Sequence, residues 1–421
     1  MRYRYLKKSD IYKYALTFLI FLVIVSSASV WVQTDVELIS PTILRYGIWM
    51  LAIILILLKL KNIKQSDYLY LVLIGICLVG YSLFNSGYVL GALFNVFIPT
   101  TLFYMLGKVN SGKNRFLICE CFVNVMCFLA VISLFFFITA SLMQIISPTG
   151  YLTYKWSWVS RVPSYFHLYY EPIPGRISQF GIPKNCGIFP EAPMFNFPLC
   201  VALGMSKLVL NNKSRFKNIV LLVTIITTGA TSGYFFAIGV YGYLIIKKYG
   251  FRNVIMKFLI GGVVAYFGYQ VISKIFENKT QTASYSIRYD HLYACISTIM
   301  NTKFMGSGVG NDSLLESFMS YRQGASVGFL YLLALGGIFC TLLLVLPLIN
   351  SSVQAIKAGN YNILCYTLLF FMLVFLTQVV FRNNMWFVVG TIFMNIKPLL
   401  LQNAHEEEHK VRLKRIRYRS I

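Results

Sequence analysis

Long apolar stretches separated by short basic segments restrict the fold of this chain more than any other feature. A membrane's hydrocarbon core, about 30 Å thick, requires about 20 predominantly apolar residues in a helix that crosses it. Only helices and closed barrels satisfy their backbone hydrogen bonds there. Apolar stretches cover residues 14–32, 46–60, 68–84, 87–107, 116–147, 191–210, 254–274, 326–349, 361–380 and 385–401. The sequence therefore predicts an all-α polytopic membrane protein.

A further apolar run, 218–247, is interrupted by the sequence TTGATSG. Its length suits two short helices hinged at Gly229 and Gly233, where small residues permit close packing. These helices bring the expected number of transmembrane helices to about twelve. The composition agrees, because 57% of the 421 residues are hydrophobic and 12% are charged, whereas soluble proteins average about 25% charged residues.

The positions of the basic residues predict the orientation. The net charge is +24, and most lysines and arginines fall on cytoplasmic segments if both termini lie in the cytoplasm, as the positive-inside rule requires. The charge thus reports orientation, and no nucleic-acid partner is expected. The basic tail suits contact with anionic membrane lipids. The nine cysteines show no metal-ligand or disulfide spacing.

Six parts of the chain follow from this orientation. They are the N-terminal transmembrane helices (1–147), a large external loop (148–190), the central transmembrane helices (191–274), a second external loop (275–325), the C-terminal transmembrane helices (326–401) and a basic cytoplasmic tail (402–421). Loops beyond about 12–15 residues are usually functional or disordered. We expect the chemistry in the two external loops, together with short amphipathic helices.

The first external loop is dense in aromatic and basic residues, among them Arg161, Tyr170, Arg176 and Lys184. Such a composition is unlike that of a disordered linker. Arginine binds phosphate through paired hydrogen bonds, and aromatic rings can stack on sugar rings. The alternative is a belt of aromatic residues at the membrane interface, which does not account for the arginines.

The second external loop contains a predicted helix at residues 284–301. Its face carries Arg288, Leu292, Cys295 and Ile299. On a helix lying along the membrane surface, Arg288 either points into a cavity or extends its guanidinium to water from an amphipathic surface.

A glycine-rich sequence follows this helix. The amides of GSGVGN (306–311), with Gly308 at its centre, suit a phosphate; an ordinary glycine turn is the alternative.

The stretch CGIFPEAPMFNFPL (186–199) places Glu191 at the start of a nearly uncharged apolar run. A helix beginning after Pro190 favours negative charge at this position. Among cations, this carboxylate could take a proton from a hydroxyl group. The alternative for Glu191 is an ordinary N-terminal helix residue, and Glu171 and Asp290 are alternative bases. Converging cations with one carboxylate suit a substrate that carries pyrophosphate, such as a lipid-linked sugar.

Four motifs occur in a defined order along the chain. They are GIF-x-E (Gly187 to Glu191), TTGATSGYFF, SIRYDHLY followed by GSGVG, and ALGG at the start of a late apolar run. In this order, with about twelve spans and a large external loop, they resemble the O-antigen polymerase/ligase superfamily. The nearest resemblance is to the Wzy-type polymerases of capsule, exopolysaccharide and O-antigen repeat units. The motifs cover residues 148–340, and the remainder resembles the family by hydropathy alone.

The resemblance implies a metal-independent glycosyltransferase without a cofactor, in the bacterial cytoplasmic membrane. A growing chain on undecaprenyl pyrophosphate would be transferred to a new lipid-linked oligosaccharide unit at the outer face. A flippase and a chain-length regulator are implied partners. Glu191, Arg176 and Arg288 match the family's catalytic positions. The candidate substrate-binding residues are Arg161, Lys184, Tyr170, Asp290, Gly308 and Arg322.

Two alternative functions remain at this point. O-antigen ligases carry a His-Asn pair ahead of the late glycine, where this sequence has Ala325 and Ser326; this departure favours a polymerase over a ligase. A flippase for lipid-linked oligosaccharide would be expected to show internal repeats and polar groups near the membrane midplane. The charged groups here cluster in the loops instead.

Overall fold

A computed structural model describes residues 8–33, 39–60, 63, 67–111, 116–153, 162–171, 183–212, 214–249, 283–320, 327–377 and 381–397. These residues are mostly helical. The helices are α1 (Lys8–Ser26), α2 (Val30–Gln33), α3 (Pro41–Leu57), α4 (Tyr68–Phe84), α5 (Val89–Ala92), α6 (Ile98–Val109), α7 (Leu117–Phe136), α8 (Ala192–Gly204), α9 (Arg215–Thr227), α10 (Thr231–Tyr249), α12 (Ala283–Asn301), α13 (Ser313–Ser317), α14 (Gly328–Lys357), α15 (Tyr361–Leu376) and α16 (Asn383–Thr391).

Five helical segments of the described chain are long and apolar enough to cross a membrane. They are Ser9–Ser26, Ser86–Val109, Leu117–Leu142, Ala192–Val209 and Gly328–Lys357. The helices α3, α4 and α15 are shorter but also apolar. The prediction of a helical, membrane-embedded, multi-pass protein is thereby confirmed. The expected span at 254–274 and the tail at 402–421 lie outside the described residues.

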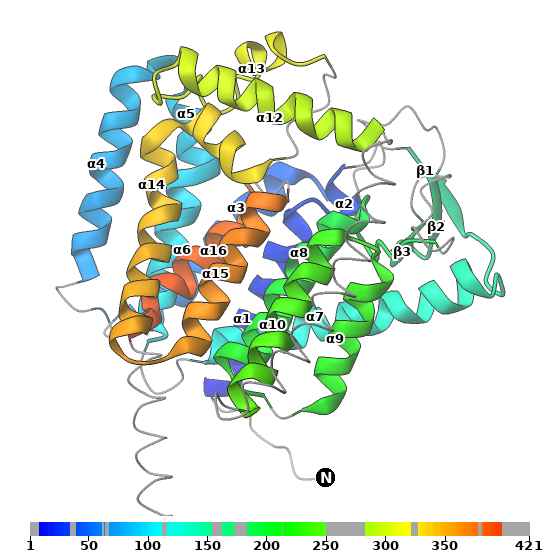
Figure 1. Cartoon of the computed structure of the whole chain (residues 1–421). Coiled ribbons are helices and arrows are strands. Elements are labelled where there is room, and N and C mark those ends of the chain that lie inside the picture. Colours follow the sequence, from blue (N-terminus) through cyan, green and yellow to red (C-terminus); the bar gives the residue numbers. More distant parts are fainter. Residues whose placement is uncertain are drawn as a thin grey trace, which may run out of the picture.

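Most of the helices stand side by side, and α12 crosses one end of the group (Figure 1). The short helix α13 and the strands lie at this same end, which we call the α12 end, whereas α1 begins at the opposite end (Figure 1). Close backbone approach holds part of the group together. A side chain at Gly107 of α6 or Gly390 of α16 would collide with the backbone of the other helix, as is common where membrane helices pack.

The apolar run at 218–247 forms two helices, as predicted. Between α9 and α10, Gly229 adopts a φ of 62°, which favours glycine. The second predicted hinge is wrong, because Gly233 lies inside α10. There it makes room for the side chain of Asn196 in α8, so it is a packing position and not a break.

The described part of the first predicted loop forms a small antiparallel sheet and not the expected amphipathic helix. Its strands are β1 (Gly150–Leu152), β2 (Val162–Tyr165) and β3 (Tyr169–Tyr170), in the order β1-β2-β3. Residues 166–168 connect β2 to β3, and Phe166 and His167 have positive φ there, a conformation uncommon for residues other than glycine. Val162, Tyr165, Tyr169 and Tyr170 are all buried. Aromatic and β-branched residues suit such a half-buried pleated surface.

The helix predicted at 284–301 is confirmed as α12. Cys295 and Ile299 on its predicted inner face are buried against Leu315, Met319 and Ala334. This helix therefore rests on α13 and on the first part of α14.

Two glycine-rich motifs meet directly beneath α12. The regular geometry of α14 breaks at Gly337 (φ 62°, ψ −168°). This break lets residues 304–308 pair with residues 334–338, a contact that we call the glycine junction. Ser307 and Gly308 donate their amides to the carbonyls of Ala334 and Leu335 at 2.9 and 3.0 Å, and Ile338 donates to the Phe304 carbonyl at 2.9 Å. The junction ties the end of α12 to α14.

Candidate functional site

Glu191 begins α8, as the sequence predicts. It is the N-cap residue with extended backbone (φ −136°, ψ 143°), and its carbonyl accepts the amides of Met194 and Phe195. Pro193 suits this first turn, because it has no amide hydrogen to satisfy there. The carboxylate is half-buried and lies where the helix dipole favours a negative charge.

The segment before Glu191 is anchored to α7 and α9 through Asn185. This buried residue donates its amide to the Thr227 carbonyl at 2.9 Å. Its side chain donates to the hydroxyls of Thr227 and Ser133 at 3.1 and 3.3 Å, and accepts the Gly187 amide at 3.1 Å.

The same segment also contacts the sheet and α2. Tyr170 donates its amide to the Gly187 carbonyl at 3.0 Å, and Val30 donates to the Ile188 carbonyl at 2.9 Å. Gly187 takes a φ of 56°, and a side chain there would collide with the ring of Phe195. Glu191 thus extends from a backbone that is held on several sides.

Two arginines interact electrostatically with the Glu191 carboxylate. Arg288 comes from α12, and Arg382 comes from the residues just before α16. Arg288 is exposed as a residue; partial desolvation lowers the pKa of its guanidinium, and the charge of Glu191 opposes this shift. Burial likewise lowers the pKa of Arg382 to about 10, again opposed by Glu191. The Arg382 guanidinium therefore remains cationic at neutral pH.

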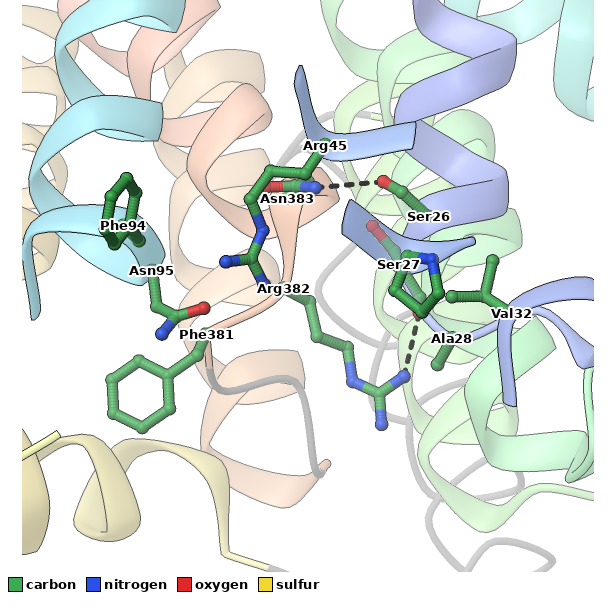
Figure 2. A pocket seen from close by; sticks show the side chains of 11 residues that line it. Ser26, Ser27, Ala28, Val32, Arg45, Phe94, Asn95, Phe381, Arg382 and Asn383 are labelled. Carbon is green, nitrogen blue, oxygen red and sulfur yellow. Dashed lines mark hydrogen bonds between the residues drawn. The ribbon is translucent and has the colours of Figure 1, made fainter. Parts of the chain in front are cut away.

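The Arg382 segment is bound to the end of α1. Arg382 donates from its guanidinium to the Ser27 carbonyl at 2.8 Å, and Asn383 donates to the Ser26 hydroxyl at 2.9 Å (Figure 2). The Asn384 amide donates to the Ser27 hydroxyl at 2.9 Å. These contacts fix both the guanidinium of Arg382 and the chain that follows it beside α1.

A cavity of about 270 Å³ lies next to Arg382 (Figure 2). It is lined by Ser26, Ser27, Ala28, Val32, Pro41, Arg45, Phe94, Asn95, Phe381, Arg382 and Asn383. Two of these residues are arginines, and among the described lining residues none is acidic. We call this space the basic cavity.

The structure brings together two of the predicted site residues, Glu191 and Arg288. Lys184 is half-buried in the anchored segment that leads to Glu191. Asp290 accepts the Ser320 amide through both carboxylate oxygens, at 3.1 and 2.9 Å. The alternative base, Glu171, accepts hydrogen bonds from Tyr165 at 2.8 Å and from Ser141 at 3.3 Å. Arg161, Arg176 and Arg322 lie outside the described residues and stay predictions.

Two further candidates have packing roles in this structure. Tyr170 is 0% exposed and its hydroxyl donates to the His167 carbonyl at 3.1 Å, so its ring offers no face to a sugar. The turn at Gly308 is used by the glycine junction, and the next amide, that of Val309, donates to the Tyr81 hydroxyl at 2.7 Å. The amides of Ser307, Gly308 and Val309 are thus already bound within the protein, which leaves them unavailable to a phosphate.

Sequence reasoning missed Arg45 and Arg382. Both lie in short connections between apolar runs, which the expected orientation places on the outer side. Arginine is uncommon on that side under the positive-inside rule, and this exception was the signal that could have identified them. Arg382 and Arg288 form a cationic site around the Glu191 carboxylate, and Arg45 lines the basic cavity together with Arg382. Such a site can bind a phosphate-bearing ligand and can accept a proton from a hydroxyl.

No model of a known protein family and no curated protein sequence matches this chain.

Proposed function

We propose that this protein is a membrane glycosyltransferase that polymerises lipid-linked oligosaccharide repeat units. It transfers the growing glycan from undecaprenyl pyrophosphate to a new lipid-linked unit, without a metal or a cofactor. The observation that carries the proposal is the Glu191 carboxylate, which interacts with Arg288 and Arg382 beside the basic cavity. The resemblance of the motif order to Wzy-type polymerases supplies the reaction class.

The proposal includes about twelve spans, with both termini in the cytoplasm of a bacterium and the α12 end outside. Lysines support this orientation. They lie in the last turns of α6, α10 and α14. The glycine junction fixes the first part of α14 at the α12 end, so its last turn is remote from that end. The positive-inside rule then places the remote end in the cytoplasm.

The chemistry follows from the charges. Glu191 takes the proton from the acceptor hydroxyl as its oxygen forms a bond to the anomeric carbon of the donor. The bond from that carbon to the pyrophosphate oxygen breaks, and the electron pair leaves with undecaprenyl pyrophosphate. Arg288 and Arg382 stabilise the charge on this leaving group, an electrostatic role that needs no metal. A single displacement inverts the anomeric configuration, because base and leaving group lie on opposite faces.

The proposed partners follow from this reaction. A flippase supplies lipid-linked units to the outer face, and a chain-length regulator limits the product. Membrane lipids surround the helices, whose large apolar side chains are exposed along α3 and α4.

The test uses three variants in the producing bacterium: Glu191→Gln, Arg288→Ala and Arg382→Ala. Arg215→Ala is the matched control, because Arg215 is exposed at the start of α9. Membrane levels are measured first, and lipid-linked glycans are then separated on a gel. We expect the three site variants to lose the polymer ladder while single units remain accessible outside the cell, and the control to keep the ladder.

Other outcomes would overturn the proposal. Single units that accumulate on the cytoplasmic side would indicate a flippase. A normal ladder that is no longer moved to its final acceptor would indicate a ligase. A ladder unchanged in all three variants would show that the Glu191 site has no part in the reaction.

A further inference from the structure

The basic cavity contains a cation that the site around Glu191 does not use. Arg45 is half-buried, and it forms neither a hydrogen bond nor an ion pair within the described part of the chain. A guanidinium has five N–H donors, and burying a charge without a partner is costly. The nearby Arg382, which also interacts with Glu191, adds a second positive charge to the same cavity, and none of the described residues that line it is acidic.

Three irregular stretches of backbone meet at this cavity. Ala28 and Phe381 are non-glycine residues with positive φ, 95° and 56°. The third stretch is the π-helical turn Leu93–Phe97, which carries Asn95. Strained backbone of this kind and π-helical turns both concentrate at functional sites. The three stretches are far apart in the sequence, and residues from all three line the basic cavity.

The walls also include polar donors and a rigid aromatic face. The Asn95 side chain donates one N–H to the Gly91 carbonyl at 2.9 Å, which leaves its second N–H available. Figure 2 shows Asn95 and Arg45 on the same side of the cavity. The ring of Phe94 stacks on Trp49 at 5.7 Å, so its position is defined by packing.

We propose that the basic cavity binds a phosphate or pyrophosphate group, with Arg45 as a ligand in addition to Arg382. Guanidinium groups match the geometry of phosphate oxygens. The volume of about 270 Å³ lies below the range of about 300–1,000 Å³ typical of drug-sized ligands. It suits a phosphate-bearing head group and not an oligosaccharide.

The source of this group is either a lipid carrier or a free anion. The lipid source rests on the proposed function, in which the leaving group is undecaprenyl pyrophosphate. Arg45 would then hold the pyrophosphate together with Arg382 and Arg288, while Glu191 acts at the reacting hydroxyl. Anion binding itself does not depend on the reaction, so the two proposals can fail separately.

The test measures binding to the full-length protein in detergent. The probes are farnesyl pyrophosphate, as a short lipid pyrophosphate, and inorganic pyrophosphate. Arg45→Gln is expected to weaken binding about tenfold or more, because a hydrogen-bonded charge contact is lost. Arg45→Lys should restore part of the affinity, and Arg215→Ala should bind like the unmodified protein. Tight binding of farnesyl pyrophosphate alone indicates the lipid source, and equal binding of both probes indicates the free anion.

A second measurement uses the unsubstituted protein, so it tests the proposal even if the Arg45→Gln protein does not fold. Phenylglyoxal modifies accessible arginines, and peptide mass spectrometry reports the modification of Arg45 in the unsubstituted protein. Inorganic or farnesyl pyrophosphate should protect Arg45 but leave Arg215 reactive. Unchanged affinity in a folded Arg45→Gln protein, or no protection of Arg45, overturns the proposal. Glu191→Gln separates the two proposals, because it should abolish polymerisation and retain pyrophosphate binding.

Discussion

The glycine junction predicts a large loss of stability for Gly337→Ala. At φ 62° and ψ −168° the backbone lies in a region that is essentially restricted to glycine, and occupying it costs about 1–3 kcal/mol. A Cβ at this position would also collide with the Met305 carbonyl. Moving residues 304–308 away from residues 334–338 weakens the three hydrogen bonds of the junction, each worth about 0.5–1.5 kcal/mol.

These contributions sum to about 3–5 kcal/mol if the strain is in mid-range and about half to all of the hydrogen-bond energy is lost. That is a large part of the 5–15 kcal/mol typical of unfolding free energies. The assay is unfolding of the detergent-purified protein in increasing SDS. Because α12 carries Arg288 and is tied to α14 by the junction, the proposed polymerase activity should fall as well.

Gly75→Ala is the matched control. Gly75 is exposed on α4, and nothing lies within 4 Å of an added Cβ. Alanine there should be neutral or stabilise the helix by up to about 1 kcal/mol. Equal unfolding free energies for Gly337→Ala and Gly75→Ala would refute the reasoning, since the junction would then tolerate a side chain where the geometry excludes one.

Two further predictions concern single groups. Tyr81→Phe leaves the buried Val309 amide without its 2.7 Å partner, so we expect a loss of about 1–3 kcal/mol in SDS unfolding; the exposed Tyr68→Phe should change little, and equal losses would contradict this. Burial lowers the pKa of Arg382 in the folded protein to about 10. At this residue the unfolded protein therefore binds more protons than the folded protein only above that pH. The contribution of Arg382 to the free energy of unfolding rises with pH only in that range. Pyrophosphate binding should therefore be independent of pH between about 6 and 8 as far as Arg382 is concerned. The unperturbed pKa of lysine is about two units below that of arginine. In Arg382→Lys, pyrophosphate binding should therefore fall, and the free energy of unfolding rise, as the pH increases through the mildly alkaline range. Binding by this variant that does not change with pH would contradict the proposal that residue 382 contributes its positive charge to the cavity.

Hydropathy located the helices because lipid permits few alternatives to a hydrogen-bonded helix. The periodicity of Cys295 and Ile299 also identified the buried face of α12. The aromatic loop was harder to predict. Tyr165, Tyr169 and Tyr170 pack inside a small sheet, and their composition alone does not distinguish a buried hairpin from a sugar-binding surface.

The candidate site was predictable only in part. Glu191 and Arg288 stand out by charge within apolar or amphipathic surroundings. Arg45 and Arg382 sit beside apolar runs without any periodic pattern, and only the tertiary arrangement brings them to one cavity. The irregular backbone at Ala28 and Phe381 has no sequence signal, because neither residue type favours positive φ.

The hydrogen bonds between residues 26–27 and 382–384 join positions 355 and 357 apart in the chain. Synthesis proceeds at about 5–20 residues per second, so the end of α1 is made about 20–70 seconds before its partners. One wall of the basic cavity is therefore absent until residues 382–384 have been made. A ribosome-bound or truncated chain lacking α16 would have α1 without the proposed anion site. The proposed binding site is thus complete only after the residues of α16 have been made.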